Sequence, residues 1–160
     1  MPKAVVYPGT FDPVTFGHID LIKRALVLFG SVTVAVTTKP GKEPLFSEKE
    51  RVALLEESLS GLKGVSVEPF SGLLVDYLKK RDASVIIRGL RALSDFESEF
   101  QQAIVNRKLS PSIESVFIMT SAKYFYLSSS VVKEVASLGG DVSCFVPGPV
   151  EAALKKRFPQ

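Results

Sequence analysis

The stretch that decides the fold is Tyr7-Pro8-Gly9-Thr10-Phe11-Asp12-Pro13-Val14-Thr15-Phe16-Gly17-His18. Before it, the short apolar run of residues 4–7 is typical of a fully buried strand, and Pro8-Gly9 marks the turn where that strand ends. From Thr15 the apolar spacing changes to three or four residues, and Gly30 supplies a stop; the residues on this helical face are Ile19, Ile22, Leu26 and Phe29. The sequence therefore predicts a buried strand that feeds an amphipathic helix through a polar loop.

The same order of strand and helix recurs along the chain. We predict further strands at residues 32–36, 65–68, 85–87 and 114–119, because each is short and apolar or β-branched. Capping-box patterns at 47–50 and 94–97 predict helix starts, and the second is followed by an apolar stripe of Phe96, Phe100, Ala103 and Ile104. A further helix is predicted from Leu74 to Leu78.

The C-terminal part of the chain is more helical. Ser128-Ser129-Ser130 offers N-caps to a helix that Gly139-Gly140 closes, and Pro149 suits the first position of a last helix. Five strands that alternate with helices predict parallel βαβ units with right-handed crossovers. The expected fold class is therefore α/β, a doubly wound open sheet of about five parallel strands with helices on both faces, formed by one domain over residues 1–160.

Composition narrows the classes of function. The net charge of +3 is small and scattered, which argues against nucleic acid as a partner, and no apolar run approaches the roughly 20 residues that span a bilayer. We expect a cytoplasmic protein, since residues 1–20 lack the pattern of a signal peptide and the single cysteine, Cys144, cannot form an intramolecular disulfide. Cys144 is expected in the core. One histidine and one cysteine cannot assemble a usual zinc site, whereas oxygen-bound magnesium stays open.

Ligands of an open α/β sheet bind outside the carboxyl ends of its strands. The loops expected at that edge span residues 7–17, 38–46, 71–72, 88–94 and 120–130. They bring together hydroxyl groups, cations and helix N-termini, which is the combination that a polyphosphate requires: Thr10, Lys42, Arg88, Arg91 and Ser128 to Ser130. The sequence therefore predicts a nucleotide as the ligand.

The phosphate loop belongs to neither common type, because it lacks both the Gly-Lys-Ser/Thr ending of a Walker loop and the three spaced glycines of a dinucleotide fingerprint. What remains is a helix start at which Gly17 lets backbone approach phosphate and His18 presents an imidazole. The alternative for His18 is a histidine satisfied within its own helical turn, and Lys42 alone could be a solvated loop lysine. Arg88 is the stronger indication, because it follows three buried-type residues and its charge needs an anionic partner.

Four motifs together resemble the phosphopantetheine adenylyltransferase family of bacterial coenzyme A biosynthesis, along essentially the whole chain. They are Gly9-Thr10-Phe11-Asp12-Pro13, Thr15-x-Gly-His18, Arg88-Gly-Leu-Arg91 and Ser128-Ser-Ser130. Thr-x-Gly-His alone is shared by the wider nucleotidyltransferase superfamily. The resemblance to this one family rests on Pro44-Leu45-Phe46, residues 88–91, Asn106-Arg107 and Gly139-Gly140-Asp141-Val142. The resemblance implies a Rossmann-like nucleotidyltransferase fold, transfer of the adenylyl group of ATP to 4′-phosphopantetheine, Mg²⁺ as the metal and a homohexamer. It leaves feedback binding of coenzyme A open.

The resemblance also implies roles for residues at matching positions. His18, Lys42 and Arg91 would be catalytic, with His18 stabilising the transition state. Phosphopantetheine would contact Thr10, Lys42, Leu74 and Arg88. ATP would be held by Thr10, Phe11, His18, Gly89, Leu90, Arg91, Glu99, Tyr124, Phe125, Tyr126, Leu127, Ser128, Ser129 and Ser130. No protein side chain is expected as a metal ligand, since magnesium would be held mainly by phosphate and water.

Three alternatives stay open at this point. A related nucleotidyltransferase could act on glycerol phosphate or nicotinamide mononucleotide. A non-catalytic module could keep the fold and sense a nucleotide, although the intact His18, Lys42 and Arg91 count against it. Nucleic-acid binding is the least supported of the three, because the positive charge is dispersed.

Overall fold

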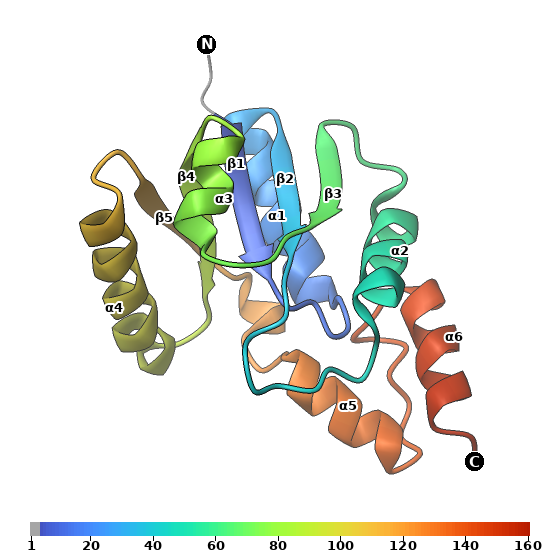
Figure 1. Cartoon of the computed structure of the whole chain (residues 1–160). Coiled ribbons are helices and arrows are strands. Elements are labelled where there is room, and N and C mark those ends of the chain that lie inside the picture. The colour runs from blue at the N-terminus through green and yellow to red at the C-terminus, as the bar shows by residue number, and fades with distance from the viewer. Residues whose placement is uncertain (1–3) are drawn as a thin grey trace.

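The computed structural model describes residues 4–160. Strands and helices alternate from the N-terminus to the fifth strand, and two helices follow (Figure 1). The strands are β1 Ala4–Gly9, β2 Val32–Val36, β3 Val65–Pro69, β4 Ala83–Leu90 and β5 Glu114–Met119. The helices are α1 Phe16–Phe29, α2 Glu48–Leu59, α3 Leu74–Lys80, α4 Leu93–Leu109, α5 Ser129–Ser137 and α6 Gly148–Arg157, with a 3₁₀ turn η1 at Ala122–Tyr124.

The five strands form one sheet in the order β3-β2-β1-β4-β5, and every neighbouring pair is parallel. The predicted α/β fold class with about five parallel strands is therefore confirmed. The chain winds outward from β1 in one direction to β3 and then returns to β4 on the other side of β1. This reversal puts the crevice that usually holds a ligand between the carboxyl ends of β1 and β4.

Alternating side chains of the strands feed two apolar layers, one on each face of the sheet. Val5 and Tyr7 of β1 face the larger layer, which is completed by α1, α2, α5 and α6. Val6 faces the opposite side, where Val75 and Leu78 of α3 cover it. In Figure 1, α3 lies over the sheet, α4 lies at the β5 edge, and α5 lies beyond the ends of the strands. The helices therefore leave the carboxyl edge of β1 and β4 open to a ligand.

Helix ends follow the predicted signals at most positions. Ser47 caps α2 through a capping box with Glu50, and Gly30 ends α1 in the left-handed conformation at φ 77°. Ser128 is the N-cap of α5, as predicted. The last helix begins one residue earlier than predicted, at Gly148, so Pro149 occupies its second position.

Two predictions about α4 and the C-terminal part were wrong, namely the second capping box and the core position of Cys144. The second capping box does not form: α4 begins at Leu93 after Ala92, and Ser94 lies inside the helix. The predicted apolar stripe is present on α4, but it is exposed, because α4 lies at the edge of the sheet against β4 and β5. Cys144 is exposed instead of core, because its neighbours Val142 and Val146 take the buried positions of that loop.

Within residues 4–160, no helix is both long enough and apolar enough to cross a membrane.

Candidate active site

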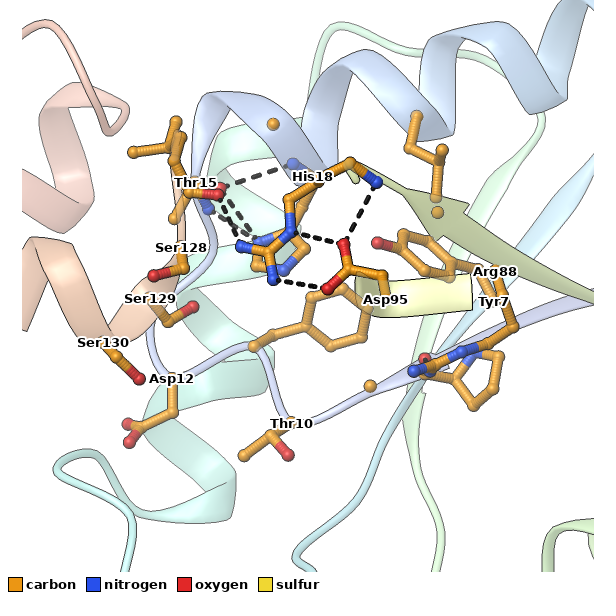
Figure 2. Close-up of a pocket in the computed structure, with 18 of the residues that line it drawn as sticks. Tyr7, Thr10, Asp12, Thr15, His18, Arg88, Asp95, Ser128, Ser129 and Ser130 are labelled. Atoms are coloured by element: carbon orange, nitrogen blue, oxygen red, sulfur yellow. Dashed lines mark hydrogen bonds and ion pairs between the residues drawn. The ribbon is translucent and has the colours of Figure 1, made fainter. Parts of the chain in front are cut away.

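A cavity of about 350 Å³ lies at the carboxyl ends of β1 and β4, where the reversal of the sheet predicts a ligand. That volume is within the range of small-molecule sites. Figure 2 shows the loop of Thr10 and Asp12 crossing the cavity, with Ser128, Ser129 and Ser130 on one side and Tyr7 and Arg88 on the other. Most of the sequence-predicted residues line it: Thr10, Phe11, His18, Lys42, Arg88, Gly89, Arg91, Glu99, Tyr124, Leu127 and Ser128 to Ser130.

The loop after β1 is shaped by the ring of Phe11. Phe11 adopts a left-handed backbone at φ 49°, which is strained for a residue with a side chain. Its buried ring packs edge-on against Tyr7, with centroids 5.2 Å apart, and against His18, at 5.0 Å. A Cβ at Gly9 would lie 2.9 Å from this ring. Glycine is therefore required at position 9 for the ring to fold back beneath the loop.

Asp12, in the wall of the cavity, connects its own loop with the loop before α2 and with α5. Its carboxylate accepts hydrogen bonds from the backbone N–H groups of Leu45, at 2.8 Å, and Phe46, at 2.9 Å. The Lys133 ammonium of α5 lies 2.9 Å from the same carboxylate. Asp12 is only 4% exposed, and its bond to the Phe46 N–H is buried, whereas the Lys133 side chain is about one-third exposed. Sequence reasoning quoted Asp12 in a motif but assigned it no role.

His18 is the third residue of α1 and completes a capping box with Thr15. The Thr15 backbone N–H donates to Nδ1 of His18 at 3.0 Å, and the His18 backbone N–H donates to the Thr15 hydroxyl at 3.4 Å. A backbone N–H can only donate, so Nδ1 carries no proton and the neutral ring carries its proton on Nε2. The alternative prediction, in which the His18 ring finds its hydrogen-bond partners within its own helical turn, thus holds for Nδ1 but not for Nε2. The Nε2–H remains for a ligand in the cavity that His18 lines.

The surroundings keep this imidazole neutral. Burial lowers the pKa of His18 to about 4, and the positive charges of Arg91 and Arg88 add to the effect. Burial likewise raises the pKa of Tyr7 to about 12, with the positive charge of Arg88 opposing the shift. Near neutral pH the site therefore presents a neutral Nε2–H donor and a neutral phenol, and its positive charge comes from arginine and lysine.

Arg88 reaches into the cavity from β4 and already has an anionic partner. Its guanidinium binds Glu99 of α4 through two hydrogen bonds of 2.7 and 2.6 Å, and it also donates to the Pro8 carbonyl oxygen at 2.9 Å. Burial opposes the charge, but the hydrogen bonds and charge of Glu99 outweigh it and raise the pKa of Arg88. The anionic partner expected for Arg88 is thus supplied within the chain, by a residue that the resemblance assigned to ATP.

Arg91 also lines the cavity and is paired in a similar way. It contacts Asp95 at 3.2 Å and donates to the Leu127 carbonyl oxygen at 3.1 Å. Burial acts to raise the pKa of Asp95, but hydrogen bonds from Arg91 prevail and lower it. A carboxylate of α4 therefore holds each of the two arginines, and a phosphate that approached them would compete with Glu99 and Asp95.

The three serines differ in whether their hydroxyl groups already form hydrogen bonds within the chain. Ser128 accepts from the Val131 N–H at 3.2 Å as the cap of α5, and Ser129 donates to the Pro13 carbonyl oxygen at 2.8 Å. Within residues 4–160 the Ser130 hydroxyl makes no hydrogen bond, and Ser130 is exposed at the rim of the cavity. Ser130 and the first-turn N–H groups of α5 are thus the donors that remain for an anion.

The structure separates four predicted residues from the cavity. Leu74 packs partly buried against the apolar layer beneath α3, and Leu90, Phe125 and Tyr126 do not line the cavity either. Conversely, the cavity contains residues that sequence reasoning left without a role. Thr120 lies inside a loop that had been predicted to face the site, Asp95 lies one residue past the loop of residues 88–94, and Lys133 lies a turn beyond the three serines. The cavity residues without a predicted role are Tyr7, Asp12, Thr15, Thr38, Asp95, Thr120 and Lys133.

Comparison with known proteins gives close relatives over the whole chain. A profile of the family described as Cytidylyltransferase-like matches residues 6–135. The chain is 56% identical to a phosphopantetheine adenylyltransferase of Caldanaerobacter subterraneus subsp. tengcongensis, with 98% of each chain covered. It is 54% identical to the protein of the same name from Thioalkalivibrio sulfidiphilus, with 99% of each chain covered.

A solved structure supports the fold independently of these names. It is a Vibrio parahaemolyticus protein provisionally assigned as a nicotinate-nucleotide adenylyltransferase. The TM-score is 0.72 at 15% identity, with 98% of this chain and 93% of that chain covered. At that identity the likeness concerns the arrangement of the backbone, and it shows that the two chains share a fold.

Proposed function

Because this chain belongs to the phosphopantetheine adenylyltransferase family of cytidylyltransferase-like proteins, we propose that it transfers the adenylyl group of ATP to 4′-phosphopantetheine. An oxygen of the substrate phosphate bonds to the α-phosphorus of ATP, and the bond from that phosphorus to the oxygen bridging to the β-phosphate breaks. The products are dephospho-coenzyme A and pyrophosphate. The family therefore makes the chain an enzyme of coenzyme A biosynthesis, and the cavity at β1 and β4 is where both substrates meet.

The observation that carries the mechanism is the fixed tautomer of His18. Its Nδ1 is occupied by the Thr15 N–H, so the imidazole offers Nε2–H in one orientation at the N-terminus of α1. Negative charge grows on the non-bridging α-phosphate oxygens as the new bond forms, and a preorganised donor aimed at that charge lowers the barrier. We assign His18 this role, with Lys42 and Arg91 of the same cavity neutralising phosphate charge.

The chemistry needs no general base. A phosphomonoester has a second pKa of about 6, so the attacking phosphate is largely a dianion at neutral pH. The protein has to align two anions and neutralise them, which gives most of the rate enhancement when the reacting groups are held in line. The cavity fits this account, because the carboxylates of Glu99 and Asp95 are paired with Arg88 and Arg91, and burial keeps His18 neutral with its Nδ1 already occupied.

Magnesium is proposed to enter bound to ATP. Within residues 4–160, no three His, Cys, Asp or Glu side chains are grouped closely enough to hold an ion. Asp12, Asp95 and Glu99 of the cavity are each engaged by a cation of the chain. Phosphate oxygens and water are the usual ligands of Mg²⁺ in nucleotide sites, and they would supply its coordination here. A cytoplasmic location and feedback binding of coenzyme A also stay predictions.

The first prediction tests substrate and reaction together. We expect the purified protein with Mg²⁺ to release pyrophosphate only when ATP and 4′-phosphopantetheine are both present, measured by a coupled pyrophosphate assay. Replacing ATP with CTP, or phosphopantetheine with glycerol 3-phosphate or nicotinamide mononucleotide, should abolish the signal. Absence of pyrophosphate with the full substrate pair would refute the proposed function, and a signal with CTP and glycerol phosphate would favour the related transferase.

We further propose that the chain assembles as a homohexamer through α4. This helix has no buried residue, although six of its large apolar side chains are between 43% and 90% exposed: Leu93, Phe96, Phe100, Ile104, Val105 and Leu109. Most of the stability of a helix in a protein comes from packing its apolar face against another surface. A large apolar face that is exposed on a monomer therefore indicates an interface with another chain. A second copy of the chain would supply an identical apolar face to pack against.

Light scattering on a sizing column should therefore give a mass near six times 17.4 kDa. Ile104→Glu places a charge in the centre of the apolar face of α4 and should lower the mass. Val27 of α1 is 87% exposed and lies on another helix, so Val27→Glu is the matched control and should leave the mass unchanged. A monomeric wild-type chain would refute the assembly.

A further inference from the structure

Arg51 of α2 is the largest fully buried side chain among the described residues, with 1% of its surface exposed. It donates to four oxygen atoms: the carbonyl oxygens of Phe46, Thr10 and Thr37 at 3.1, 2.7 and 2.9 Å, and the Thr38 hydroxyl at 2.6 Å. It makes no ion pair with a carboxylate within residues 4–160. A buried guanidinium is costly to desolvate, and a fold that needed only to fill this space could use an apolar side chain instead.

The four acceptors belong to the loops that carry the predicted phosphate ligands. Thr10 lies on the loop after β1, Thr37 and Thr38 follow β2, and Phe46 ends the loop that contains Lys42. Thr10, Thr38 and Lys42 line the cavity, whereas Arg51 does not. The Arg51 guanidinium, which is outside the cavity lining, therefore fixes the spacing between the loop after β1 and the loop after β2. Its rigid, planar set of donors can bind several acceptors in fixed directions, which an ammonium group does less well.

The bond to Thr10 also sets the direction of a backbone donor. The carbonyl group and the N–H group of a trans peptide point in opposite directions, so a Thr10 carbonyl that faces Arg51 turns the Phe11 N–H away from it. That N–H donates to no other backbone group within residues 4–160. Phe11 reaches this position only through its left-handed conformation, at φ 49°, which the surrounding contacts have to hold.

We propose that Arg51 is a positioning residue for adenylyl transfer, which sets the Thr10 and Lys42 loops and aims the Phe11 N–H at phosphate. The inference rests on the proposed function and deepens it. Arg51 touches no substrate, and its effect passes through the Thr10 carbonyl oxygen and the Thr38 hydroxyl. Loss of one or two of its hydrogen bonds should let the two loops shift by a fraction of an ångström, which is enough to disturb in-line alignment.

Two variants test it in the full-length protein. Arg51→Lys keeps the positive charge and loses the fork of donors, and Thr38→Val removes a single acceptor from an exposed position, where folding is not at risk. Arg157→Met is the matched control, because Arg157 lies 5.2 Å from the centre of the Phe46 ring and pairs with Glu50, and neither Arg157 nor Glu50 lines the cavity. Pyrophosphate release is measured well below the melting temperature of each variant, with folding checked by circular dichroism.

We expect kcat to fall by about tenfold or more in Arg51→Lys and by about threefold in Thr38→Val, with smaller changes in KM for ATP, and no change in Arg157→Met. A structural role alone would lower the melting temperature and leave kcat of the folded protein intact. Wild-type kcat in folded Arg51→Lys and Thr38→Val would therefore overturn the inference. Inactivity of the wild-type protein would instead overturn the proposed function, so the two failures are distinguishable.

Discussion

His18→Ala is expected to lower kcat by roughly 10² to 10³, with the affinity for ATP changed only a few-fold. The hydrogen bond from Nε2–H is strongest when negative charge develops on the α-phosphate oxygens. Its loss therefore destabilises the transition state more than the bound substrate. Turnover is measured by pyrophosphate release and ATP affinity by calorimetry. Equal losses in binding and turnover would contradict this role and return His18 to ordinary substrate binding.

His18→Ala also removes a helix cap, so the two effects must be separated. The Thr15 N–H would lose its acceptor, and such losses at an N-terminus typically cost about 1 kcal/mol of stability. His18→Asn is the matched variant, because its side-chain oxygen can accept from the Thr15 N–H as Nδ1 does, yet nothing replaces Nε2–H. We expect the melting temperature of His18→Asn to stay close to that of the wild type while kcat stays as low as in His18→Ala.

The protonation state on which this role depends is measurable, since the chain contains one histidine. In an untagged protein, the imidazole signals should report the Nε2–H tautomer and a pKa of about 4, below the ordinary value of 6.5. The unfolded chain then takes up the proton first as the pH falls, so this contribution to stability is complete above about 6.5 and is lost as the pH approaches 4. An acid limb of activity near 6 would belong to the substrate phosphate.

The sequence predicted what depends on local pattern. The buried strands, the capping box at Ser47 and the approach of Arg88, Arg91 and Ser128 to one edge follow from periodicity and from the rule for parallel sheets. The exposure of Cys144 and of the α4 stripe could not be predicted in this way, since periodicity shows which side of an element is apolar but not whether anything covers it.

The hydrogen bonds and ion pairs that join the loops of the site could not be predicted from the sequence pattern for a different reason. Arg51 and Thr10 are 41 residues apart, and Asp12 and Lys133 are 121 apart, so no local spacing joins them. Each of these residues has a polar or charged side chain of the kind usually found at the surface, and only the folded structure shows that Arg51 and Asp12 are buried. The same holds for Glu99 and Asp95, whose pairing with the two arginines depends on where α4 lies against β4.

Asp12→Ala is expected to lower the free energy of unfolding by about 3 kcal/mol. The substitution leaves the Leu45 and Phe46 N–H groups without their acceptor and the Lys133 ammonium without its anion, all beside an almost fully buried position. Urea unfolding would measure the loss as a lower midpoint. Asp141→Ala is the matched control, because Asp141 accepts from the Ser143 N–H at 2.8 Å but is exposed, where water replaces the lost bond.

A double-mutant cycle with Lys133→Met divides this loss between the ion pair and the two amides. If the pair dominates, Lys133→Met alone should destabilise nearly as much as Asp12→Ala, and the double variant should add little. We expect the opposite, a smaller loss in Lys133→Met, because the Lys133 side chain is about one-third exposed and water can partly replace its partner, whereas the Phe46 N–H bond is buried. A wild-type midpoint in Asp12→Ala would contradict the stabilising role assigned to this carboxylate.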